Sequence, residues 1–118
     1  MVNDVFQRLV DARAREDWVE AATICEKELG DFPQATTCWR QVVEKEPSRL
    51  DAHDAMQRLC AMQGDWAMLA SVLKHRLKIV PPEQQRAVLT ELLAVCRDQL
   101  ADDHAVAAIE AKLAELPA

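Results

Sequence analysis

Four cysteines and three histidines are the side chains best suited to nucleophilic or metal chemistry in this sequence. The cysteines are Cys25, Cys38, Cys60 and Cys96, and the histidines are His53, His75 and His104. No two cysteines form a C-x-x-C pair, and His53 and Cys60 are two helical turns apart, too far to ligate one zinc ion without other ligands between them. We therefore interpret the thiols as reduced and buried and the imidazoles as solvated, with no metal and no cofactor.

Motifs for catalysis are missing as well. The sequence has no glycine-rich phosphate loop, no H-E-x-x-H and no G-x-S-x-G. Ser48 and Ser71 are the only serines, and Ser48 is better explained as a helix cap, with Asp51 completing a pair like a capping box. We expect no enzymatic activity, and only a positive turnover assay would support an enzymatic function.

Composition indicates one helical domain. The 118 residues are half hydrophobic and include only two glycines and no tyrosine. The net charge is −6 with no Lys/Arg cluster, which argues against a nucleic-acid partner. The N-terminus does not read as a signal peptide, and no apolar run approaches the ~20 residues that span a membrane. These features predict a cytoplasmic protein without a membrane span.

Apolar residues recur at helical spacing in seven segments with short connections, so sequential helices should be antiparallel neighbours. The first covers residues 2–15 and has Phe6, Leu9 and Val10 on one stripe. The buried stripe of the fourth is expected to comprise Leu50, Met56, Leu59 and Cys60. Breaks within hairpins are predicted at Gly30-Asp31, Gly64-Asp65 and Ala101-Asp102, where glycine suits a helix end and aspartate caps the next helix. No strand pattern is present.

Three similar units follow from matching spacings. Steps of four and then eight residues connect a small or aliphatic residue, a large residue and a proline; the triplets are Ala35-Trp39-Pro47, Leu69-Leu73-Pro81 and Ala105-Ile109-Pro117. Cys25, Cys60 and Cys96 precede the first members by ten, nine and nine residues. Helix pairs that recur at 30-odd residues are typical of helical repeat proteins.

Residues 15–117 resemble the tetratricopeptide repeat, whose pattern is W-x2-L-G-x2-Y, then A-x3-F, then P. The first unit has Trp18, Ala21, Ala22 and Cys25 and the turn Gly30-Asp31-Phe32. Departures are Ala22, Gln57 and Leu93 at the usual glycine, cysteine at the usual tyrosine, and His53 at the first position. Other helical-hairpin repeats, such as the HAT and Sel1 types, stay open as alternatives.

The resemblance implies an all-α fold of antiparallel helix hairpins, stacked as a short right-handed α-solenoid of about seven helices. The expected organisation is an N-terminal helix at 1–15 and repeats at 16–47, 48–81 and 82–118. It also implies a protein-binding groove on the concave face, formed by the first helix of each repeat. The binding positions carry over onto Val19, Thr23, Glu26, Lys27, Asp54, Arg58, Ala61, Met62, Thr90, Ala94, Arg97 and Asp98.

The implied function is a non-catalytic interaction module, a scaffold or adaptor that binds a peptide segment or helix of a partner protein. Chaperone-binding members hold a terminal carboxylate with Lys and Asn where this chain has Val19 and Thr23. Arg58 and Arg97 are the side chains that could hold a carboxylate differently, with two hydrogen bonds from a guanidinium.

The alternative is a structural spacer or self-assembly segment of a longer array. Its motivation is that the sequence stops at Pro117-Ala118, directly after the third repeat, where stacked hairpins normally carry a polar capping element. Further repeats or a homo-oligomer would then cover that end.

Overall fold

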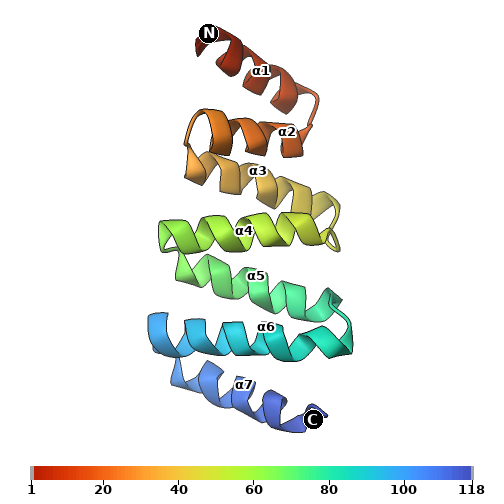
Figure 1. Cartoon of the computed structure of the whole chain (residues 1–118), viewed down its shortest axis with the longest axis vertical. Coiled ribbons are helices and arrows are strands. Elements are labelled where there is room, and N and C mark those ends of the chain that lie inside the picture. The colour runs from red at the N-terminus through yellow and green to blue at the C-terminus, as the bar shows by residue number, and fades with distance from the viewer. Residues whose placement is uncertain (1, 118) are drawn as a thin grey trace. The chain divides into compact units, whose positions relative to one another are not determined.

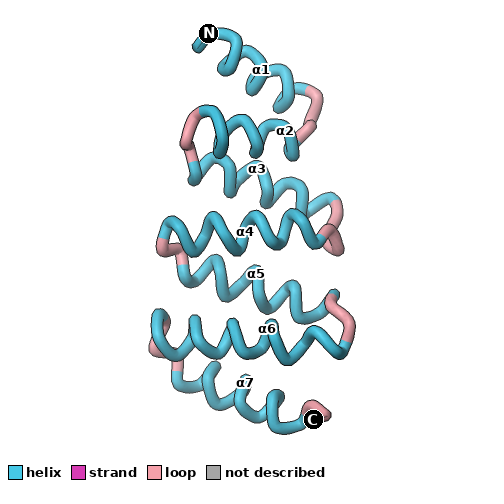
Figure 2. The backbone as a smooth tube through the Cα atoms, viewed as in Figure 1, coloured by secondary structure: helices cyan, strands magenta, loops and turns pink. Residues whose placement is uncertain are grey.

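The computed structural model describes residues 2–117, and over that range its regular structure is helical throughout (Figure 1, Figure 2). The helices are α1 (Val2–Ala14), α2 (Trp18–Thr23), α3 (Phe32–Lys45), α4 (Leu50–Gln63), α5 (Trp66–Ile79), α6 (Pro82–Ala94) and α7 (Asp103–Glu115). Two of them continue into single π-helical turns: α2 into η1 (Ile24–Glu28) and α6 into η2 (Val95–Gln99). The expected all-α fold class is confirmed.

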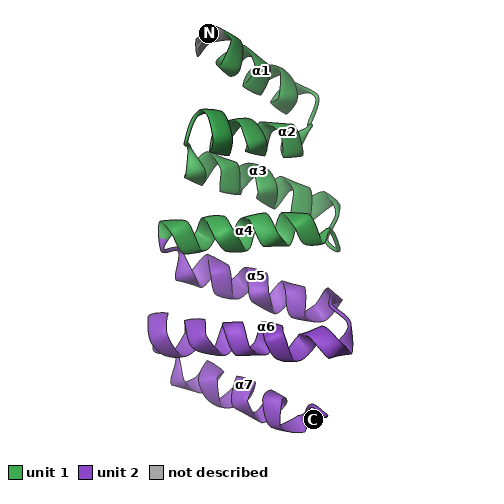
Figure 3. Ribbon diagram, in the orientation of Figure 1, with its two compact units in different colours: residues 1–63 green, residues 64–118 purple. Residues whose placement is uncertain are grey.

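The chain divides into two compact units, residues 1–63 and residues 64–118 (Figure 3). In unit 1, α1 packs on α2, α2 with η1 packs on α3, and α3 packs on α4. In unit 2, α5 packs on α6 and α6 packs on α7. Within each unit the chain reverses direction at every connection (Figure 1), so each helix is antiparallel to the next. The division at Gly64 lies inside the segment predicted as the second repeat.

Aspartates define the starts of the helices that follow each predicted break. The carboxylates of Asp31, Asp65 and Asp102 cap α3, α5 and α7 by accepting a hydrogen bond from the backbone N–H three residues later, at 3.2 Å for Asp31. Gly30 and Gly64, which precede two of these caps, have φ values of 63° and 70°. Both the glycine and the aspartate predictions are confirmed.

Three cysteines at matching positions of the spacing pattern are separated from these caps by unequal numbers of residues. Cys25, Cys60 and Cys96 are all 1% exposed or less. The capping aspartate follows six positions after the cysteine in the first and third cases but five positions after it in the second. The first and third cases are the two in which the helix ends in a π turn.

The π turns absorb this extra residue. In η1 the N–H of Leu29 donates to the carbonyl of Ile24 at 3.1 Å, and the N–H of Asp31 donates to the carbonyl of Cys25 at 2.8 Å. The same two hydrogen bonds recur at the end of η2, at 3.1 and 2.9 Å. Wider rings of this kind insert one residue without breaking the helix. The cysteine therefore stays buried and the aspartate still caps the next helix, despite the extra residue between them.

Small side chains form the contact between α2 and α3 in unit 1. Ala21, Ala22, Cys25 and Ala35 are completely buried, which lets the two helix axes approach closely. Trp39, at 8% exposure, lies one turn after Ala35 and supplies bulk to the same core. The assignment of Ala35 as the close-approach position and Trp39 as the large position agrees with this packing.

Larger aliphatic side chains fill the core of unit 2. Leu73, Leu89, Leu92 and Ile109 are between 1% and 5% exposed and come from all three helices of the unit. Full burial of one such side chain stabilises a fold by roughly 1.5–3 kcal/mol. By contrast, Ala105 is only half-buried, although the spacing pattern equates it with the completely buried Ala35.

His53 is buried, at 1% exposure, so the prediction of a solvated imidazole is wrong for this residue. Its Nε2 lies 2.8 Å from the carbonyl oxygen of Pro47, which fixes the loop between α3 and α4. The spacing pattern equates His53 with Trp18, and at this position the imidazole adds a hydrogen bond.

The start of one helix and the burial of three apolar side chains differ from expectation. Helix α4 begins at Leu50 rather than Ser48, and the Asp51 carboxylate accepts a hydrogen bond from Arg49 Nε at 2.8 Å, so the capping-box prediction is wrong. Leu50, predicted to be buried, is 39% exposed because it occupies the first turn. On α1, Leu9 is buried, whereas Phe6 and Val10 are 50% and 59% exposed.

Candidate functional site

In unit 1 the predicted binding residues form two stripes. They are Val19, Thr23, Glu26 and Lys27 on α2 and η1, and Asp54, Arg58, Ala61 and Met62 on α4. Six are exposed, Val19 and Glu26 are half-buried, and none is buried. Successive members are mostly three or four residues apart, so each stripe follows one face of its helix. Buried residues such as Ala22 and Cys25 alternate with them along the sequence and face the core.

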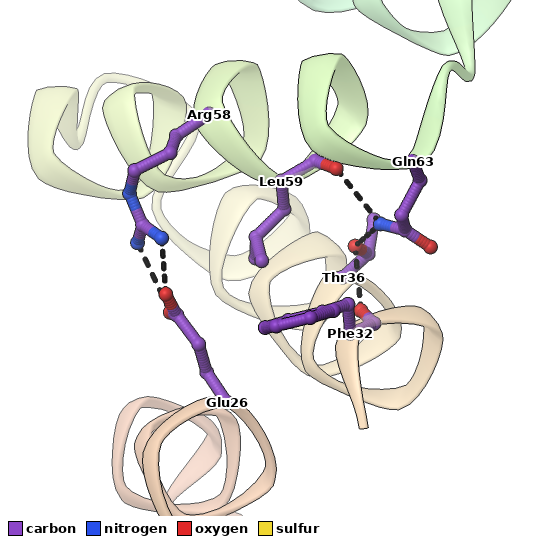
Figure 4. Close-up of polar contacts among 6 residues, drawn as sticks. All are labelled: Glu26, Phe32, Thr36, Arg58, Leu59 and Gln63. Atoms are coloured by element: carbon purple, nitrogen blue, oxygen red, sulfur yellow. Dashed lines mark hydrogen bonds and ion pairs between the residues drawn. The ribbon is translucent and has the colours of Figure 1, made fainter. Parts of the chain in front are cut away.

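An ion pair joins the two stripes. Arg58 Nη2 donates to Glu26 Oε1 at 3.0 Å, and Arg58 Nη1 donates to the other carboxylate oxygen (Figure 4). The Glu26 side chain is 14% exposed and that of Arg58 is 48% exposed. The hydrogen bonds from Arg58 hold the pKa of the Glu26 carboxyl below its usual value, and they raise the pKa of Arg58. Arg58 therefore holds a carboxylate with two bonds, as expected for a guanidinium, but that carboxylate belongs to its own chain.

The turn η1 is contacted by arginines from two different helices. Besides Arg58 from α4, Arg8 from α1 pairs with Glu28 at the end of η1. Both arginines form ion pairs with acidic residues of the π turn, Glu26 and Glu28. Exposed pairs of this type each contribute at most about 1 kcal/mol, so their main effect is on side-chain position.

Gln63 fixes the end of α4 against α3. Its Nε2 donates to Thr36 Oγ1 at 2.9 Å and to the carbonyl of Leu59 at 3.0 Å (Figure 4). The Thr36 hydroxyl in turn donates to the carbonyl of Phe32 at 2.9 Å. This chain of hydrogen bonds determines where the last turn of α4 lies, and with it the exposed Met62.

In unit 2 the predicted binding residues form one stripe. Thr90 and Ala94 lie on α6, Arg97 and Asp98 lie on η2, and all four are exposed. The hydroxyl of Thr90 donates to the carbonyl of Arg86 at 2.8 Å, so its proton is already used. Unlike Arg58, Arg97 forms no ion pair with any residue in the described range 2–117. The guanidinium of Arg97 is therefore available to a ligand.

The cysteines are poorly placed for chemistry. All four are buried and unbridged. Burial raises the pKa of the Cys25 thiol to about 11, with a further contribution from the neighbouring Cys38. Burial also raises the pKa of Cys38 and of Cys96. Thiolates, which are the nucleophilic form, are thus disfavoured at neutral pH. Among the described residues, no cluster of three or more His, Cys, Asp or Glu side chains is arranged to hold a metal ion.

A groove of about 470 Å³ in unit 2 contains none of the predicted binding residues. We call it the α5–α7 groove, because α5 and α7 form its walls and α6 its floor. It is lined by Lys74, Leu77, Lys78, Leu89, Leu92, Asp102, His104, Ala105, Ala108, Ile109 and Lys112. The sequence signal that could have indicated this groove is the pair Ala105 and Ala108, two small residues on one face of a helix that packs beside leucines. It was overlooked because the repeat pattern assigned Ala105 to close packing.

Comparisons with known proteins identify no relative. No family model, no curated protein and no solved structure matches this chain. Of the helices described, none combines the length and the apolar character that crossing a membrane requires.

Proposed function

We propose that this chain is a non-catalytic protein-interaction module of the tetratricopeptide type, which binds a peptide segment or a helix of a partner protein. The proposed binding surface of unit 1 consists of the stripes on α2–η1 and α4, and the stripe on α6–η2 is proposed as a separate binding surface of unit 2. The observation that carries the proposal is the Glu26–Arg58 ion pair. It joins side chains 32 positions apart, which supports the expectation that the stripes on α2–η1 and α4 act together.

The composition of that surface supports binding rather than catalysis. It combines apolar Val19 and the exposed, flexible Met62 with charged groups on both stripes, a mixture suited to a segment of another protein. The buried thiols and the imidazole of His53, which is bonded to Pro47, lie away from it. Four of the twelve positions lie on π turns, which recur at functional sites in other helical proteins.

The two arginines have different roles in this proposal. Arg97 is unpaired and offers its guanidinium directly to a carboxylate of the partner. Arg58 must first break its ion pair with Glu26 before it can form a new one with the ligand carboxylate. Affinity should therefore depend more strongly on Arg97 than on Arg58.

The test compares protein captured from a lysate of the source organism by wild type and by an Arg58→Ala, Arg97→Ala, Val19→Asp variant. A matched control carries Arg40→Ala, Arg86→Ala and Ala111→Asp, which also removes two arginines and adds one aspartate outside the proposed surface. Circular dichroism verifies that both variants fold. We expect the first variant alone to lose specific partners, identified by mass spectrometry. If both variants retain the same partners, the proposal is wrong and the spacer interpretation is preferred.

A further inference from the structure

We propose that the α5–α7 groove is a second docking surface, which binds a short acidic amphipathic helix of a partner protein. None of its lining residues belongs to the stripes described above. The inference therefore stands apart from the proposed function, and either can fail without the other.

The floor of the groove is apolar and rigid. Leu89 and Leu92 on α6 and Ile109 on α7 are at most 5% exposed and hold the base of the groove in place. Above them the side of α7 is lined by Ala105, half-buried, and Ala108, exposed. Since alanine ends at Cβ, these positions leave room for side chains from outside. A volume of about 470 Å³ lies within the range of ~300–1,000 Å³ typical of ligand sites.

The rim of the groove is basic, although the chain as a whole carries a net charge of −6. Lys74 and Lys78 stand on α5 and Lys112 stands on α7, all exposed. None of these lysines forms an ion pair with another residue in the described part of the chain. The acid at the groove, Asp102, already accepts the hydrogen bond that caps α7. Charge complementarity thus calls for a ligand with carboxylates on both of its flanks.

The spacing of Lys74 and Lys78 matches one turn of a helical ligand. Lys74 and Lys78 are one turn apart on α5, or about 6 Å along its axis at ~1.5 Å per residue. Carboxylates at positions i and i+4 of a partner helix have the same spacing. Apolar residues between them would enter the groove above Ala105 and Ala108, while the opposite flank meets Lys112. An amphipathic helix laid into an apolar groove is an established mode of peptide recognition.

The experiment is a selection from a random peptide display library against the full chain. Counter-selection uses Ala108→Trp, which fills the groove from an exposed position, and Ala111→Trp is the control because it is exposed on the same helix outside the groove. We expect enriched peptides with Leu, Ile or Phe at helical spacing and Asp or Glu at i and i+4. Fluorescence anisotropy of an enriched synthetic peptide should show binding weakened about tenfold by Lys74→Glu, Lys78→Glu, Lys112→Glu. Arg86→Glu, a charge reversal in the same unit outside both proposed surfaces, should leave binding nearly unchanged.

Several outcomes would overturn the inference. If the selection yields no peptide that prefers the wild type over Ala108→Trp, the groove does not bind a peptide. Enrichment of neutral or basic peptides would refute the role of the lysines. Self-association abolished by Ala108→Trp would assign the groove to a second copy of the chain, and saturable oleate binding without peptide enrichment would assign it to a lipid. Enriched peptides that bind Ala108→Trp normally but are lost with Arg58→Ala, Arg97→Ala, Val19→Asp would support the proposed function alone.

Discussion

Cys25 and Cys38 are neighbours in the core of unit 1, and the proximity of Cys38 adds to the effect of burial in raising the pKa of Cys25. Their proximity follows from the fold, because η1 and α3, which carry the two residues, pack against each other. Each thiol is fully or nearly fully buried, at 0% and 2% exposure. Ionising either one would place a negative charge in the core of unit 1.

Burial of Cys25 makes stability depend on alkaline pH. Its pKa rises from the ordinary value of 9.0 to about 11 in the folded chain. Below about pH 9 the thiol is protonated in both the folded and the unfolded chain, so the contribution of Cys25 to the free energy of unfolding is fully present. That contribution is lost as the pH rises from about 9 toward 11. Urea denaturation across this window should show the free energy of unfolding falling more steeply for wild type than for Cys25→Ala. Parallel curves for the two proteins would contradict the assignment.

Glu26 provides the opposite pH dependence. Arg58 lowers the pKa of Glu26, so the stabilisation from this pair is present above the ordinary value of 4.5 and is lost as the pH falls through the folded value. Arg58→Ala should return the pKa of Glu26 toward 4.5, as followed by carboxyl chemical shifts in an NMR titration. Arg97→Ala is the control, because Arg97 does not pair with Glu26. A Glu26 titration unchanged by Arg58→Ala would show that the pair does not persist in solution.

Leu73 and its neighbour Lys74 test the helical register of α5. Leu73 is 1% exposed, and Leu73→Ala should lower the free energy of unfolding by about 2–5 kcal/mol through loss of apolar contact and creation of a cavity. Lys74 is exposed, and Lys74→Ala should change stability by roughly 0.5 kcal/mol or less. Chemical denaturation measures both, and equal effects would refute the assigned register.

Removal of His53 should be much more damaging than removal of His104. His53→Ala leaves a cavity and an unbonded carbonyl at Pro47, which together should cost about 2–4 kcal/mol. His104 is exposed, so His104→Ala should have little effect. Thermal unfolding followed by circular dichroism compares the two variants. Similar losses would mean that the contact with Pro47 contributes nothing to folding.

Ala101 is a site where glycine should stabilise the protein. Its φ is 49°, in the left-handed region that disfavours a Cβ, and it takes the place after η2 that Gly30 takes after η1. Ala101→Gly should therefore raise the free energy of unfolding by about 1 kcal/mol. The matched control, Ala107→Gly, lies on an exposed face within α7 and should lower stability by about 1 kcal/mol. A loss of stability in both variants would show that Ala101 is not strained.

Much of the fold could be predicted from sequence because its signals are local. The glycines, the capping aspartates and the prolines each act on the few residues beside them, and the helix boundaries followed them closely. His53 was misjudged because burial depends on which helix packs against a position, and Leu50 was misjudged because α4 begins there and not at Ser48. Neither residue type nor spacing along one helix carries that information.

The candidate sites show the same limit. Spacing placed Glu26 and Arg58 on stripes of two helices, but pairing of their charges required the two helices to be positioned against each other. The α5–α7 groove was missed because it forms where Ala105 and Ala108 leave space unfilled beside α5 and α6. Such a hollow depends on what three helices leave unfilled, and no single segment contains it.

The π turns have a consequence for how such a chain can vary over evolutionary time. A one-codon insertion in a helix normally rotates everything beyond it by about 100°, turning buried residues outward. Here the wider turn takes up the added residue before the following cap, as the unequal spacings after Cys25, Cys60 and Cys96 indicate. Hairpins of different length can thus present the same face. Equivalent positions in chains of this kind are aligned correctly only if gaps are permitted inside the last turn of a helix.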